Sequence, residues 1–151
     1  MEIRTVELSP RRKKQGYQES DFQSKFTAWQ KKNPYILPPT FGIELKVVNT
    51  AHNKSLSIRD FEVQQLPALQ RIKTRNGIGK KLSDLDQTLK PFDYFFISCS
   101  AGLIGVEFYT FKQPHYFYVM DVDVFLNATK QKGKPYLNEK EIAHIATRYD
   151  L

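Results

Sequence analysis

Cysteine is almost absent from this chain of 151 residues, in which Cys99 is the only example. A lone cysteine excludes an intramolecular disulfide and a zinc site built on several thiolates. Cys99 lies in the apolar stretch FFISCSAG, which favours a buried inert thiol over a nucleophile. We therefore expect a protein of a reducing, intracellular compartment, with the cytoplasm as the default.

Long hydrophobic runs are also missing, since no apolar segment approaches the roughly 20 residues of a membrane-spanning helix. The first residues, MEIRTVELSPRRKKQGY, are polar and basic where a secretory signal would have an apolar core. Histidine is scarce, and His52, His115 and His144 show no ligand spacing. These absences lead us to expect no membrane contact and no histidine-based metal site.

Acidic residues are in deficit, because 16 of them stand against 23 lysines and arginines and leave a formal net charge of +7. Such an excess favours polyanionic partners, nucleic acid first, with a merely soluble basic surface as the alternative. The bases gather in an N-terminal arm, in a glycine-containing segment after residue 70 and at residues 130–134, which suits a groove that tracks phosphates. The DNA-binding candidates are Arg11, Arg12, Lys13, Lys14, Arg75, Lys80, Lys81 and Lys90.

The organisation expected is a flexible basic arm at residues 1–16 and a single domain at residues 17–151. Helical spacing of Phe22, Phe26 and Trp29 predicts a first helix that buries these rings. The expected elements after it are a strand at 41–50, an extended piece at 55–58 that returns after a turn, a helix from 60 to 73, a basic loop at 73–90 and three strands between 93 and 123. A short helix at 124–130 and a last helix at 138–149, capped by Asn138, complete the chain. This order predicts an α/β fold, a mixed central sheet with helices packed on it.

The stretch FGIELKVVNT, residues 41–50, carries the main functional signal. Residues i and i+2 of a strand point to one face, so Glu44 and Lys46 stand side by side while Ile43, Leu45 and Val47 face the other way. Burying two charges on one face is costly unless they pair, bind a metal or meet water in a cleft. The segment is therefore either an edge strand with a salt bridge or one wall of an active site.

With a following helix that bears Gln65 in VQQLPAL and the later stretch KPFD, this triplet resembles the PD-(D/E)XK nuclease superfamily. Within it, the chain is similar to small Holliday-junction-resolvase-like and phage-type endonucleases over roughly residues 18–130. The resemblance implies a restriction-endonuclease-like fold, with Glu44-x-Lys46 on a strand, Gln65 on the next helix and Glu19 of QESDFQSKF on the first helix. The family's usual first Asp is missing before Glu44, so we assign that role to Asp93, entering from a neighbouring strand.

A rival frame pairs Asp93 with Glu107 of GVEFY, but Tyr109 then stands where the family has its lysine. In the preferred frame Asp93, Glu44 and Glu19 would bind Mg²⁺ or Mn²⁺. Lys46 would orient water and offset charge on the phosphate, and Gln65 would hold water or the pocket. The function implied is a metal-dependent DNA endonuclease, with branched DNA of recombination and repair as substrate and two symmetric cuts made by a homodimer.

A different class of function stays open, a nucleic-acid-binding or regulatory module on a nuclease fold whose acids have become structural. Other acidic and aromatic groups have simpler explanations than a ligand role. Asp121 and Asp123 pose as a metal pair, but Asp123 is better explained as the cap of a helix that begins near Val124. The aromatic residues at 94–96 and 116–118 alternate as strand faces do and are expected in the core, not in a base-stacking platform.

Overall fold

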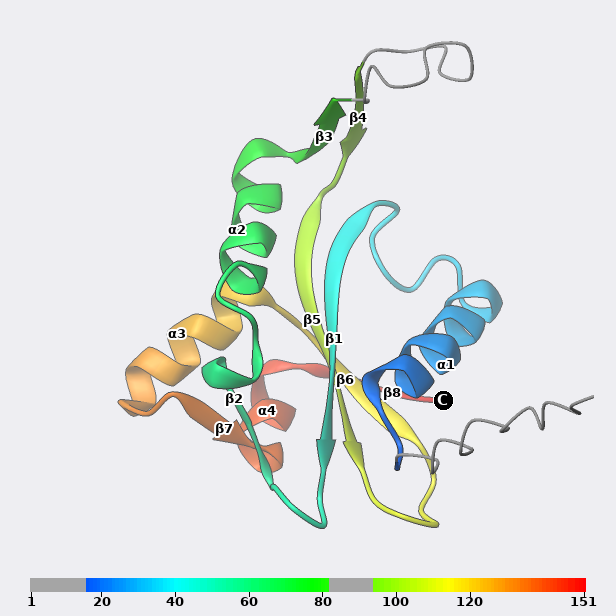
Figure 1. The fold of residues 1–151 in the computed structure, drawn as a ribbon, viewed down its shortest axis with the longest axis vertical. Coiled ribbons are helices and arrows are strands. Elements are labelled where there is room, and N and C mark those ends of the chain that lie inside the picture. Colours follow the sequence, from blue (N-terminus) through cyan, green and yellow to red (C-terminus); the bar gives the residue numbers. More distant parts are fainter. Residues whose placement is uncertain (1–15, 82–93) are drawn as a thin grey trace, which may run out of the picture.

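The computed structural model describes residues 16–81 and 94–151 of the chain (Figure 1). Four α-helices form within this part: α1 (Glu19–Lys32), α2 (Gln65–Arg75), α3 (Val122–Lys132) and α4 (Glu139–Ile145), with a 3₁₀ turn, η1, at Ile58–Asp60. The strands are β1 (Phe41–Asn49), β2 (Ser55–Ser57), β3 (Gly77–Lys81), β4 (Tyr94–Ser98), β5 (Ala101–Tyr109), β6 (Tyr116–Asp121), β7 (Tyr136–Asn138) and β8 (Thr147–Asp150).

A mixed four-stranded sheet, ordered β1-β5-β6-β8, organises the chain. Strand β1 pairs in parallel with β5, whereas β5–β6 and β6–β8 are antiparallel. Strand β5 is buried along almost its whole length because helices cover both faces, which explains its nearly continuous apolar sequence. The expected mixed α/β architecture is therefore confirmed, and β1 is the outer strand on one side of this sheet.

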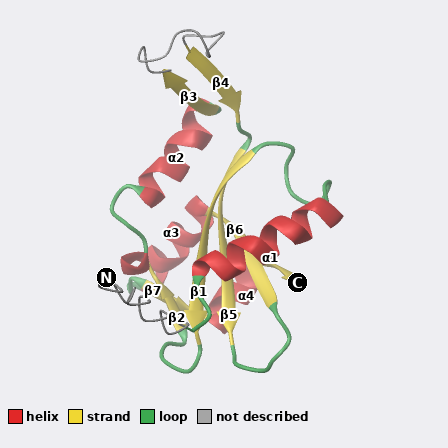
Figure 2. Cartoon of the chain, turned by 45° about the vertical axis from the view of Figure 1, so that its right-hand side comes forward, coloured by secondary structure: helices red, strands yellow, loops and turns green. Residues whose placement is uncertain are grey.

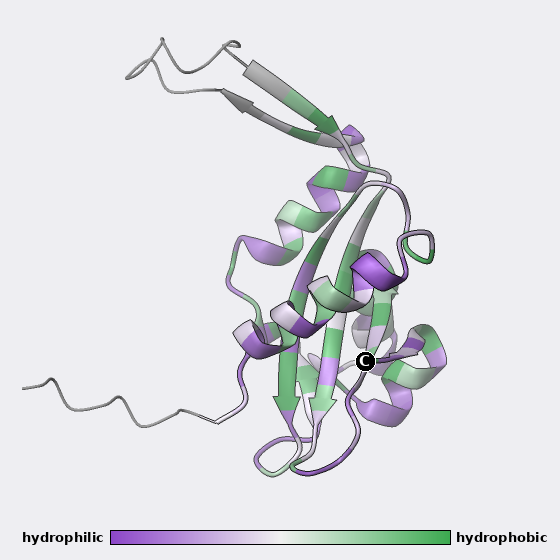
Figure 3. Ribbon diagram, turned by 90° about the vertical axis from the view of Figure 1, so that its right-hand side faces the viewer, coloured by the Kyte–Doolittle hydropathy of each residue, from purple (hydrophilic) through white to green (hydrophobic). Residues whose placement is uncertain are grey.

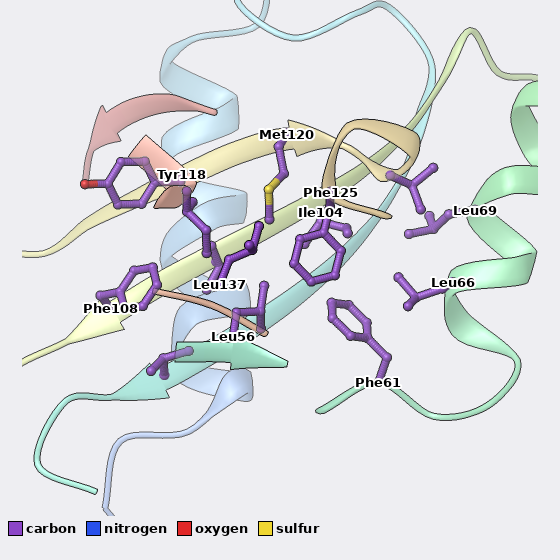
Figure 4. Close-up of a cluster of buried hydrophobic side chains, with 14 residues drawn as sticks. Leu56, Phe61, Leu66, Leu69, Ile104, Phe108, Tyr118, Met120, Phe125 and Leu137 are labelled. Atoms are coloured by element: carbon purple, nitrogen blue, oxygen red, sulfur yellow. The ribbon is translucent and has the colours of Figure 1, made fainter. Parts of the chain in front are cut away.

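Helices α1 and α2 cover opposite faces of the sheet (Figures 1 and 2). Phe22, Phe26 and Trp29 of α1 are buried as expected, and the rings of Phe26 and Trp29 pack edge-on against Phe117 of β6. On the other face, α2, α3 and α4 close a second core around β5 (Figure 4). Helix α2 comes so close there that a Cβ on Gly102 would lie 2.4 Å from a backbone carbonyl oxygen of the helix.

Two small two-stranded sheets differ from the expectations. The extended piece at 55–58 does not return along β1; it forms β2 and pairs with β7. The segment expected to be a basic loop from residue 73 continues α2 to Arg75 and then forms β3, which pairs with β4 in a ribbon that projects beyond the main sheet (Figure 1). Asn76 turns the chain between them in the left-handed conformation, with φ of 57°, which Asn tolerates better than most residues.

Several helix boundaries also differ from the predictions. Helix α2 begins at Gln65, after Val63, which is 93% exposed instead of lying on the apolar face. The side chain of Asp121, not of Asp123, caps α3 by accepting a hydrogen bond from the backbone of Asp123. The Asn138 cap of α4 is confirmed, but the helix stops at Ile145 and the following residues form β8.

Cys99 is buried, as the sequence indicates. None of the helices in the described part of the chain has the length and apolar character required to cross a membrane.

Candidate active site

Strand β1 carries Glu44 and Lys46 on the face that turns toward α2, in register with Ile104 and Val106 of β5. Ile43, Leu45 and Val47 pack on the opposite face, in the core that α1 covers. The alternation read from the sequence is therefore present. Since β1 is the outer strand, its long polar side chains reach the sheet edge.

The ammonium group of Lys46 occupies the centre of the site although its side chain is only 8% exposed. Its Nζ lies 3.4 Å from Oε1 of Glu44 and 3.6 Å from Oε1 of Glu19. The Nζ atom also lies over the ring of Phe61, 5.3 Å from the centroid of that ring, in a cation–π arrangement. A buried ammonium requires such partners, because its desolvation would otherwise be very unfavourable.

Glu19 reaches this point because it is the first residue of α1. The helix begins here because the backbone N–H of Gln18 donates a 2.8 Å hydrogen bond to Asp21 Oδ2, as in a capping box. The helix dipole also favours acidic residues such as Glu19 in the first turn. A hollow of about 280 Å³ separates α1 from β1. Its lining residues are Glu19, Gln23, Phe26, Thr27, Ile43, Glu44 and Leu45. Both acidic residues of the site thus line one hollow.

Gln65 fixes the orientation of Glu44 from the start of α2. Its Nε2 donates to Oε1 of Glu44 at 2.7 Å, while its own Oε1 accepts from the backbone N–H of Glu62 at 2.8 Å. The neighbouring Gln64 instead donates to the Glu62 carboxylate. Gln65, which the resemblance singled out, is the amide that belongs to the site.

The structure thus brings together Glu19, Glu44, Lys46 and Gln65, from three separate elements. Phe61, beneath Lys46, is a member that the sequence did not reveal, because an apolar residue before a helix carries no local sign of a cation above it. Asp93 lies outside the described residues, as do Arg11, Arg12, Lys13, Lys14, Lys90 and the side chains of Lys80 and Lys81.

The donor set has the chemistry of a hard cation site, since carboxylate oxygens are the ligands that Mg²⁺ prefers. All contacts of Glu19 and Glu44 with Lys46 and Gln65 use Oε1. Both residues also line the hollow between α1 and β1. No group of three or more metal-ligating side chains forms among residues 16–81 and 94–151, so two carboxylates plus water are what this part offers.

Glu107 lies on the opposite face of the sheet, in register with Val47 instead of Lys46. It is 1% exposed, accepts a 2.6 Å hydrogen bond from the Tyr17 hydroxyl, and lies 2.5 Å from Nδ1 of His115. The pKa of Tyr17 is raised, mainly by burial of its hydroxyl and next by its hydrogen bond to the Glu107 carboxylate. Glu107 therefore belongs to a buried network with Tyr17 and His115, on the face of the sheet opposite to Lys46, while its partner in the rival frame, Asp93, lies outside the described residues.

Acidic partners neutralise part of the basic segments. Lys73 donates hydrogen bonds to both Asp121 and Asp123, and these bonds raise the pKa of the lysine. The pKa of Asp123 is lowered, first by a hydrogen bond from Gln70 and second by the one from Lys73. This cluster joins α2 to α3 and is structural. The bases near residue 130 are similarly engaged, because Lys132 and Lys134 pair with Glu141.

Arg71 and Arg75 differ from Lys73, because both are exposed and neither forms an ion pair with a described residue.

No protein-family model matches this chain, and no curated protein matches its sequence.

Proposed function

We propose that the chain is a Mg²⁺-dependent DNA endonuclease with a restriction-endonuclease-like core, acting at the β1 edge. The observation that carries the proposal is the convergence of an acid and a lysine of one strand with an acid from α1 and an amide from α2. Lys46 Nζ is within 3.6 Å of both carboxylates, so Glu19 and Glu44 flank one ammonium group at the β1 edge.

Each residue then has a definite task. Glu44 and Glu19, which both line the hollow, would hold the metal through their carboxylates, with Asp93 as a further candidate ligand outside the described residues. Magnesium bound there would supply a more acidic water and neutralise charge on the phosphate. Lys46 would place its ammonium against the phosphate oxygens as negative charge develops. Gln65 would keep the Glu44 carboxylate in one orientation, which pre-organises the site.

A non-catalytic DNA-binding module is the second candidate, and one observation favours it. Lys46 forms an ion pair with each of the two carboxylates without any added ion and compensates one of their two negative charges. Such an ion-paired group is stable as a purely structural feature, and the retained basic excess would still attract DNA.

Single-turnover cleavage separates the two candidates. Labelled duplex, flap and four-way DNA are incubated with the full chain in Mg²⁺ and in EDTA, beside a binding titration at fixed salt. Lys46→Ala should lower the cleavage rate by about 10²–10³, as for other lost transition-state contacts, while leaving DNA affinity nearly unchanged. Glu44→Ala should be at least as damaging, because the metal loses a ligand too. Lys54→Ala, which removes an exposed lysine after the same strand, is the matched control.

Two outcomes would count against the endonuclease. Wild-type protein that binds DNA but does not cut with any divalent metal would establish the binding module. Cleavage that survives Lys46→Ala at the wild-type rate would mean that the chemistry resides elsewhere and that the β1 pair is a structural ion pair.

A further inference from the structure

The ribbon of β3 and β4 exposes apolar side chains at a distance from both cores. Ile78 and Ile97 form a half-exposed cross-strand pair, and Phe96 is 54% exposed although the aromatic run around it was expected in the core. Figure 3 shows hydrophobic stretches on both strands of the described part of the ribbon. A two-stranded ribbon is barely stable by itself, so exposed apolar groups on it call for a functional explanation.

Phe96 is held as a flat platform by the glycines of β3. It pairs in register with Gly79, and a Cβ on Gly77 would lie 2.4 Å from the Cζ atom of its ring. The ring therefore rests directly on the β3 backbone at Gly77, which only a glycine permits. One side of the ring is supported by the ribbon, and more than half of the side chain stays open to solvent.

A basic pocket adjoins this platform. The hollow has a volume of about 370 Å³, within the usual range of small-ligand pockets, and contains no acidic lining residue. The lining residues are Ala68, Arg71, Ile72, Arg75, Gly77, Ile78, Gly79 and Phe96. Arg71 and Arg75 are four residues apart on α2 and so share one helix face. With no acid engaging them in the described part of the chain, both guanidinium groups remain available to an anion.

We propose that this pocket binds an unpaired nucleotide of the DNA substrate, with its base stacked on Phe96 and its flanking phosphates on Arg71 and Arg75. Proteins bind single strands by stacking the nucleobases on aromatic side chains and by contacting the backbone phosphates with positively charged side chains. The bases inside a continuous duplex are stacked on each other and cannot reach the ring, which selects for strand ends, flaps or branches. The inference rests on the proposed function in taking DNA as the substrate.

Helix α2 relates this pocket to the candidate active site. Gln65 is its first residue and Arg75 its last, so at about 1.5 Å per residue the two places lie roughly 15 Å apart along the helix axis. At about 3.4 Å per base pair this distance corresponds to roughly four to five pairs. Cleavage by the β1 site would thus fall a few nucleotides from the unpaired base.

Binding in EDTA tests the pocket without any cleavage. Fluorescence anisotropy of the full chain with an oligo-dT strand and with a blunt duplex of equal length gives the two affinities. Phe96→Leu keeps an apolar side chain over Gly77 but removes the aromatic face. It should weaken dT binding about 5- to 150-fold, the range for one lost base–aromatic stack, and leave duplex binding unchanged. Phe96→Tyr should bind dT as the wild type does.

The arginines and the controls complete the design. Arg71→Gln with Arg75→Gln should reduce the salt slope of dT binding by up to about 1.4, because each phosphate contact on a single strand contributes about 0.7. Phe111→Leu, at another exposed phenylalanine (72%), and Arg59→Gln should leave dT affinity and its salt slope at wild-type values. An oligonucleotide with 5-iodouracil should photocross-link to Phe96.

Equal dT affinity for wild type and Phe96→Leu, or cross-links that map elsewhere, would overturn the proposal. A wild-type dimer that Phe96→Leu converts to a monomer at unchanged dT affinity would also overturn it, since the patch would then be an interface between copies. Wild-type protein that never cuts but loses dT binding on Phe96→Leu would refute the endonuclease and leave the nucleotide pocket standing.

Discussion

The buried Glu107 network gives a direct prediction about stability. Tyr17 precedes α1, and its hydroxyl donates a 2.6 Å hydrogen bond to a carboxylate that is 1% exposed. Tyr17→Phe removes this donor and leaves the ring, which stacks on Tyr109 with centroids 4.3 Å apart. Hydrogen bonds to charged groups contribute about 1.5–3 kcal/mol, so we expect a loss of that size in the free energy of unfolding.

Urea unfolding followed by circular dichroism at pH 7 measures this loss. With a urea slope near 2 kcal/mol/M, as is usual for small proteins, the midpoint should fall by about 0.75–1.5 M. Tyr35→Phe removes the hydroxyl of a side chain that is 95% exposed and should leave the midpoint unchanged. A Tyr17→Phe midpoint equal to that of wild type would refute the reasoning, because His115 alone would then satisfy the carboxylate.

Two further predictions concern α3 and the contact between α2 and the sheet. Asp121→Ala should cost about 0.5–2 kcal/mol as the loss of an N-cap, and Asp123→Ala under about 1 kcal/mol because its pair with Lys73 is half exposed, as urea midpoints would show. The pKa of Asp123 is lowered in the folded state, so wild type should be more stable to unfolding than Asp123→Asn at pH values above the ordinary carboxyl pKa of about 3.9. This difference in stability should fade as the pH falls through the folded-state pKa. Urea midpoints of both proteins at pH 7 and pH 2.5 are the check. Gly102→Ala should cost about 1–3 kcal/mol, because its Cβ would collide with the helix backbone, whereas Gly16→Ala meets open space and should be neutral in the same unfolding assay.

The parts of the fold that the sequence predicted depend on local periodicity. Alternation along β1 separates Glu44 and Lys46 from their apolar neighbours, and the 3.6-residue repeat of α1 buries its aromatic face. The Asn138 cap likewise needs only residues within one turn. These features are set by a few neighbouring side chains, so a single sequence contains what is needed to find them.

Pairing partners far apart in the chain were beyond such reasoning. Glu107 and Tyr17 are 90 residues apart, and nothing near either one indicates that they meet. The ribbon was misread because Gly77 and Gly79 suggest a loop, whereas in the fold Gly77 leaves room for the Phe96 ring. Strand β8 was taken for the end of the last helix, because its extended conformation depends on pairing with β6, which lies elsewhere in the chain.

The environment of Lys46 bears on why a charge is kept there. Its side chain is 8% exposed and lies over the ring of Phe61, a place where an apolar side chain of similar length would pack without desolvating an ammonium. Replacing buried ion pairs by apolar groups is often neutral or stabilising, so the pairs with Glu19 and Glu44 are weak grounds for stability. Both acidic residues meanwhile line the hollow, which a cation and a phosphate would enter in the proposed function. A charge retained where packing does not need it, beside two acidic residues that line a hollow, favours a chemical role over a purely structural one at β1.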